Sequence, residues 1–135
     1  MRLHLRTSTR WLVAAIGALS MACASDSYVA PSTVCQGSIN VSVESGPTPK
    51  FHWTPACGLH RISVIAPPSN GPVSPTMWDL RADARFLGPG LRYGDKPEGT
   101  VTLANASPVT HGTTYAVLFV AESGQPPIAS LSWSP

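Results

Sequence analysis

The chain has 135 residues and a formal net charge of +2. Residues 23–135 carry six Lys and Arg against seven Asp and Glu, so without the preceding segment the net charge is −1. This balance excludes the basic patch of a nucleic-acid binder, and the length leaves room for one ordinary domain but not for a separate catalytic domain.

The N-terminal segment is basic and then apolar. Three arginines within the first ten residues precede an uncharged stretch from Trp11 to Ala22. That stretch has the length of a signal-peptide core and is well short of the roughly 20 residues that a transmembrane helix needs. We therefore expect residues 1–22 to be a signal peptide and the protein to be exported.

The end of this segment resembles a bacterial lipoprotein signal, in which Leu, Ala or Ser, and Gly or Ala precede a cysteine that becomes the lipidated first residue. The corresponding positions here are Ser20, Met21, Ala22 and Cys23. Ala22 fits, whereas Leu19 lies one position too far upstream and Met21 is larger than usual. The resemblance implies a lipid anchor at Cys23 and a place at a membrane of the cell envelope.

A second reading of the same residues remains open. Ala22, Cys23 and Ala24 also fit an ordinary Ala-x-Ala cleavage site, which would release a periplasmic or secreted protein that begins at Ser25. The chain has three cysteines. Lipidation would use Cys23 for the anchor, and ordinary cleavage would remove it with the signal peptide. Both interpretations leave Cys35 and Cys57 free to form a disulfide.

Residues 23–35 are expected to be the anchor cysteine followed by a flexible spacer, because Ala24 to Val34 are mostly small or polar. Such a spacer would lift the domain off the membrane by on the order of 20 Å. Residues 36–135 are expected to form a single domain.

The sequence of the domain predicts short strands separated by turns, and 14 prolines in the chain argue against long helices. Only Met77 to Phe86 could supply two or three helical turns, and the region from Trp78 to Gly99 matches no clear strand pattern. We therefore predict an all-β fold, an antiparallel β-sandwich.

The first predicted hairpin has apolar residues at odd positions on both arms. Pairing Val41 with Phe51, and Ile39 with Trp53, makes the residue numbers of each pair sum to 92. The numbers of Cys35 and Cys57 sum to the same value, so this register places the two cysteines opposite each other on the core side. We predict a disulfide between them, which an exported protein can form.

Three further strands follow from apolar alternation. The first covers Arg61 to Ala66. The second, Tyr115 to Ala121, is apolar on both faces, as expected of a central strand. The last ends the chain with Ala129, Leu131 and Trp133.

Two motifs resemble the fibronectin type III family over residues 38–135. Val109 to Tyr115, followed by alternating apolar residues, looks like the Gly-Thr turn and the tyrosine that opens the penultimate strand of that family. Phe51 to Pro55 looks like its second strand, with Trp53 in the core. The resemblance implies that Tyr115 forms a structural tyrosine corner, and that the domain serves in binding or as a spacer, not in catalysis.

No residue pattern in the chain predicts catalysis, a metal site or a cofactor. His52, Cys57 and His60 are too few and too mixed to make a metal site, and no serine lies in a nucleophile motif. Four carboxylates interleave with basic residues in the middle region, which favours a solvated surface with ion pairs over an acid/base pair. These carboxylates are Asp79, Asp83, Asp95 and Glu98.

The stretch Trp78 to Gly94 is the candidate binding surface, because it combines aromatic residues, arginines and glycines. The residues assigned to binding are Arg85, Arg92 and Tyr93. The competing interpretation places Trp78 and Phe86 in the core. The sequence thus predicts an envelope module that recognises a protein or a glycan, or alternatively a structural accessory subunit of an envelope assembly.

Overall fold

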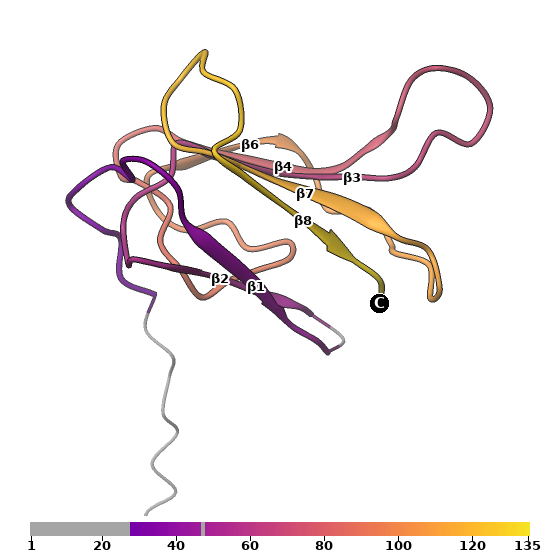
Figure 1. Cartoon of the computed structure of the whole chain (residues 1–135), viewed down its shortest axis with the longest axis horizontal. Coiled ribbons are helices and arrows are strands. Elements are labelled where there is room, and N and C mark those ends of the chain that lie inside the picture. The colour runs from indigo at the N-terminus through magenta and orange to yellow at the C-terminus, as the bar shows by residue number, and fades with distance from the viewer. Residues whose placement is uncertain (1–27, 47) are drawn as a thin grey trace, which may run out of the picture.

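The computed structural model describes residues 28–46 and 48–135 (Figure 1). The expected signal peptide and Cys23 lie outside the described residues. Within them, no helix is long and apolar enough to cross a membrane. The described strands are β1 (Asn40–Glu44), β2 (Lys50–Thr54), β3 (Arg61–Ile65), β4 (Thr76–Ala82), β5 (Leu91–Arg92), β6 (Thr100–Ala104), β7 (Tyr115–Val120) and β8 (Ala129–Trp133).

The strands form two antiparallel sheets. One has three strands in the order β1-β2-β5, and the other has five in the order β6-β4-β3-β7-β8. In Figure 1 the three-stranded sheet lies below the five-stranded sheet. The predicted all-β sandwich is therefore confirmed, and β7 is an interior strand of the larger sheet as its two apolar faces predict.

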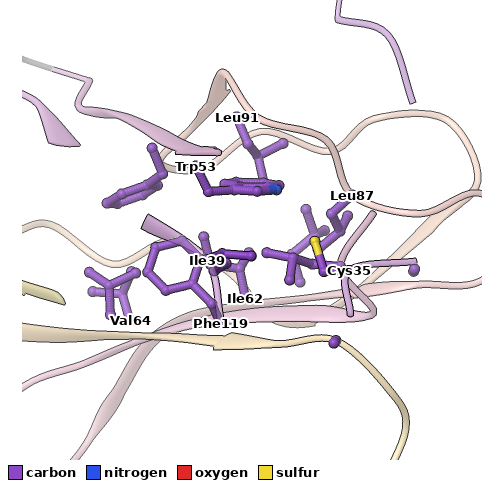
Figure 2. Packing of buried hydrophobic residues seen from close by; sticks show 14 of the residues in the cluster. Cys35, Ile39, Trp53, Ile62, Val64, Leu87, Leu91 and Phe119 are labelled. Carbon is purple, nitrogen blue, oxygen red and sulfur yellow. The ribbon is translucent and has the colours of Figure 1, made fainter. Parts of the chain in front are cut away.

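The core fills the space between the sheets. Figure 2 shows Trp53 and Leu91 approaching from the three-stranded side, while Ile62, Val64 and Phe119 approach from the five-stranded side. All five are buried, and Trp53 packs edge-to-face on Phe119 with 5.8 Å between ring centroids. Burial of such side chains from both sheets is the main stabilising term for a sandwich of this size.

The predicted hairpin is present, but its register was wrong by two residues. Val41 lies opposite Trp53, and Val43 lies opposite Phe51. The predicted register would have placed Pro49 in the ladder, where it has no N–H to donate. The observed register keeps Pro49 outside the ladder and still points the odd-numbered residues toward the core.

The predicted disulfide between Cys35 and Cys57 is present, with 4.8 Å between the two Cα atoms. It does not arise by extension of the β1-β2 ladder. Instead, Val34 and Gly58 form an isolated parallel bridge, in which the Cys35 N–H donates to the Gly58 carbonyl at 2.8 Å. The pairing of the cysteines was correct, and the reasoning about their register was not.

The middle region holds three strands that the sequence pattern did not reveal. β4 occupies most of the segment that could have been helical, and it points Trp78, Leu80 and Ala82 into the core. β5 has two residues, and β6 forms the edge of the larger sheet beside β4. A register irregularity between Asp79 and Leu80 interrupts the β4-β6 pairing, and such irregularities weaken the period-2 signal.

Candidate functional site

The described chain begins with a segment that is fixed to the domain. The Tyr28 hydroxyl donates a hydrogen bond to the Phe86 carbonyl at 3.1 Å and accepts one from the Gly88 N–H at 2.6 Å. We call residues 28–31 the Tyr28 strap. This part of the expected spacer lies on the domain surface, so the domain begins before Gln36.

The strap approaches the domain backbone closely at Gly88. A Cβ atom at this position would lie 2.7 Å from the Val29 carbonyl oxygen and 2.8 Å from the Pro31 ring. Only glycine leaves enough room for such a contact. The fit between the strap and the loop after β4 therefore depends on this residue.

The three residues assigned to binding have different environments. Arg85 and Arg92 are exposed, whereas Tyr93 is half-buried. The Tyr93 hydroxyl donates toward two backbone carbonyls, those of Ser107 at 2.7 Å and Met77 at 3.2 Å, and its ring packs against Trp78. Tyr93 thus has a structural role that the sequence pattern did not indicate.

Tyr115 occupies the position expected of a tyrosine corner. It is the first residue of β7 and is 3% exposed. Its hydroxyl accepts a hydrogen bond from the backbone N–H of Thr110, five residues upstream, at 2.8 Å. The contact ties the loop before β7 to the sandwich.

The residues considered for a metal site do not come together. Cys57 is bonded to Cys35, and the His52 ring nitrogen lies 3.2 Å from a carboxylate oxygen of Glu44. No group of three His, Cys, Asp or Glu side chains capable of holding a metal ion occurs among residues 28–46 and 48–135.

A polar cluster lies on the outer face of the five-stranded sheet, on the side away from the core. Arg61 on β3 donates two hydrogen bonds to the Asp79 carboxylate on β4, from Nε to Oδ1 at 2.8 Å and from the terminal guanidinium to Oδ2. The Ser63 hydroxyl donates to Asp79 Oδ1 at 3.1 Å. Ser63 and Asp79 are register partners, so the pairing of β3 with β4 brings these groups together.

Asp79 is 4% exposed, although it lies on an outer face. The interpretation of Asp79 as part of a solvated surface was therefore wrong. Burial of a carboxylate requires paired and hydrogen-bonded partners, which Arg61 and Ser63 supply. The bond to Asp79 also raises the pKa of Arg61 above its ordinary value, so the guanidinium stays protonated at every physiological pH.

This cluster lies at a hollow of about 260 Å³. Leu118 and Val120 on β7 and Ile65 on β3 supply apolar walls, and the loop between β7 and β8 closes one side. A concave site with apolar walls and a few convergent polar groups is the usual form of a small binding site. We call this site the outer-face hollow. The β4 register that forms it was not visible in the sequence.

No family model, curated protein or solved structure matches the chain.

Proposed function

We propose that the protein is an exported, lipid-anchored β-sandwich module of the bacterial cell envelope that recognises a protein or a glycan. The observation that carries the anchor is the position of Cys23, directly after the apolar N-terminal run and the small residue Ala22. The disulfide between Cys35 and Cys57 is compatible with the anchor because it does not use Cys23, although cleavage after Ala24 would leave the same two cysteines. A cysteine bearing several acyl chains anchors stably in a bilayer.

The proposal includes a fibronectin type III-like or immunoglobulin-like identity for the sandwich. Two features support it. Strands β3, β7 and β8 are neighbours in one sheet, as the C, F and G strands are in immunoglobulin-like domains, and β1 and β2 pair in the other. Tyr115 bonds to backbone upstream in the manner of a tyrosine corner. The disulfide and the additional edge strand β6 are departures from the family pattern.

We assign recognition to the outer face of the five-stranded sheet and its hollow. The apolar groups Leu118 and Val120 are half-buried there beside a fixed guanidinium, so a partner could bury apolar surface and satisfy a charged donor at one place. We expect no catalysis, because no serine of the chain lies in a nucleophile motif and the carboxylate that accepts from the Ser63 hydroxyl is already engaged in an ion pair with Arg61. The alternatives are a structural accessory subunit and a secreted, non-lipidated binding domain.

The anchor is tested by mass spectrometry of the mature N-terminus after detergent extraction. A lipid-modified Cys23 supports the anchored module. A mature chain that begins at Ser25 would contradict it and would favour the secreted alternative.

Recognition is tested with a glycan array and by crosslinking in intact envelopes. We expect Leu118→Glu to abolish the signal, because it places a charge at the hollow. Ser42→Glu, at an exposed position of the other sheet, is the matched control and should leave binding intact. Stoichiometric copurification with one envelope complex that both variants preserve would instead favour the structural subunit.

A further inference from the structure

The attachment of the Tyr28 strap sets how the domain can sit on a membrane. Cys23 lies five residues before Tyr28 in the chain. Five residues span at most about 18 Å when fully extended. Two hydrogen bonds hold Tyr28 to the loop after β4. Residues 28–34 therefore add no length to the tether, which is the chain between Cys23 and Tyr28.

The strap lies on one side of the molecule. One hollow of about 730 Å³ is lined both by Tyr28 and by Lys50 and His52, which point outward from β2. The strap therefore borders the outer face of the three-stranded sheet at the end of the sandwich where β4 ends, because another hollow places it beside Ala82. In Figure 1 the described chain likewise begins on the side of that sheet, while the long β3-β4 loop projects at the far end of the molecule.

The tether is shorter than the domain is wide. A domain of this size has a radius of gyration of about 13 Å, which corresponds to a diameter of roughly 30 Å. For the five-stranded sheet to face the bilayer, the chain before Tyr28 would have to pass around the domain, a path longer than about 18 Å. An anchor at Cys23 thus favours the orientation with the strap toward the bilayer over its reverse.

Basic side chains gather on the side that this orientation turns toward the bilayer. Tyr28 lines three hollows, and their walls include four of the six Lys and Arg of residues 23–135. These are Lys50, Arg85, Arg92 and Lys96, accompanied by the carboxylates of Asp83, Asp95 and Glu98. The net attraction to anionic lipid is small, so the short tether supplies most of the effect by raising the local concentration of headgroups.

We propose that the surface around the Tyr28 strap rests on the lipid headgroups, with Lys50, Arg85, Arg92 and Lys96 meeting their phosphates, and that the outer face of the five-stranded sheet is turned away from the membrane. The inference rests on the proposed lipid anchor at Cys23. It assigns Arg85 and Arg92, first considered for partner recognition, to the membrane. Tyr28 is then a positioning residue, since it fixes the point where the tether leaves the domain.

The test uses the full-length protein in vesicles of phosphatidylglycerol and phosphatidylcholine that carry a nitroxide quencher on their headgroups. One fluorescent thiol label is placed at Glu98→Cys beside the strap. A second variant carries it at Ser130→Cys, on the outer face of β8. We expect a marked loss of fluorescence for the label at position 98 and little loss at position 130. Equal quenching of the two labels, or stronger quenching at position 130, would overturn the proposal.

Two further variants test the cause of the orientation. Tyr28→Ala should reduce the difference between the two labels, because it frees the strap and lengthens the tether. A long Gly-Ser insertion before Tyr28 should reduce it further. A difference that persists unchanged in both variants would exclude the tether as the cause.

Failure of the anchor itself gives a different result. Protein without a lipid at Cys23 does not float with the vesicles. The same protein without an introduced cysteine would take up the thiol label only if an unmodified Cys23 were present. Protein that floats but shows equal quenching contradicts the orientation alone.

Discussion

The guanidinium of Arg61 and the carboxylate of Asp79 form a two-pronged ion pair across β3 and β4, on the outer face of the larger sheet. The two partners are unequally buried, since the side chain of Asp79 is 6% exposed and that of Arg61 is 44% exposed. Loss of Arg61 would leave the buried carboxylate of Asp79 without a counter-charge. Loss of Asp79 would leave a guanidinium that water can reach. The carboxylate is therefore the group that depends on the pair.

This asymmetry predicts the effect of breaking the pair. Arg61→Met should lower the free energy of unfolding by about 2 kcal/mol, because the Asp79 carboxylate loses two charge-assisted bonds in a buried position. Chemical denaturation measures the change. Arg81→Met, at the outward position of β4 opposite Arg61, is the control and should change stability by less than about 0.5 kcal/mol.

Removing both charges tests the same interpretation from the other side. The double variant Arg61→Met, Asp79→Leu should recover most of the lost stability, because no buried charge remains. A double variant that is much less stable than Arg61→Met alone would show that the two losses add, and that the pair is not coupled.

The disulfide should contribute more to the free energy of unfolding than any single hydrogen bond does. It joins residues separated by 22 positions, for which the loss of loop entropy in the unfolded chain gives about 3 kcal/mol. The variant Cys35→Ala, Cys57→Ala should lose about that much in chemical denaturation. Free thiols at both positions in the unreduced protein, found by mass spectrometry, would contradict the bond itself.

The fold was predictable where apolar alternation is strong and local. β3, β7 and β8 fall where their patterns predicted strands, and the inward residues of β1 and β2 were identified correctly. The hairpin register was predicted wrongly. Pro49 restricts which residues can join the ladder, and alternation alone does not distinguish registers that differ by two residues. The cysteines still paired, through a bridge outside the ladder.

The outer-face hollow was not predictable for a different reason. Its polar groups come from β3 and β4, which are joined by a connection of ten residues, and β4 itself alternates only from Trp78 onward between charged and apolar residues. Arg61 and Asp79 are 18 positions apart in sequence, so nothing local marks them as partners. A period-2 reading of Trp78, Leu80 and Ala82 was the signal that could have placed Asp79 on the outer face.

The tyrosine corner gives a prediction with little change in side-chain volume. Tyr115→Phe removes the acceptor for the Thr110 N–H and should lower the free energy of unfolding by about 1 kcal/mol. Thermal unfolding measures it. Gly112, with φ of 81° in the same turn, supplies the control for loop geometry, since Gly112→Ala strains the turn without touching the hydroxyl. An unchanged free energy of unfolding in the Tyr115→Phe variant would mean that this hydrogen bond does not contribute to stability.

Gly88→Ala tests how the Tyr28 strap is attached to the domain. The added Cβ would overlap the Val29 carbonyl and the Pro31 ring, so we expect the strap to leave the domain while the sandwich stays folded. Hydrogen exchange of the Gly88 and Phe86 region should increase, and limited proteolysis should cut earlier within residues 28–34. Unaltered exchange and cleavage would mean that the strap accommodates the methyl group by a small shift.

The Tyr28 hydroxyl also predicts a pH dependence. Burial raises the pKa of Tyr28 above its ordinary value of 10.0, against a smaller opposing effect of the Gly88 N–H. The folded state therefore favours the neutral phenol. Its contribution to stability is complete below pH 10.0, the unfolded value, and is lost as the pH rises through the higher folded value. Ionisation removes the proton donated to the Phe86 carbonyl, so the strap should detach in strong alkali.

The measurement is an ultraviolet titration of tyrosinate absorbance, with the Tyr28→Phe variant subtracted to isolate this residue. We expect a transition above pH 10.0, accompanied by greater protease sensitivity of residues 28–34 at the same pH. The pKa of Tyr93 is also raised by burial, so Tyr93→Phe serves as the matched control and should leave the Tyr28 transition in place. A Tyr28 transition below its ordinary value would mean that the Gly88 N–H outweighs burial, and that alkali tightens the strap.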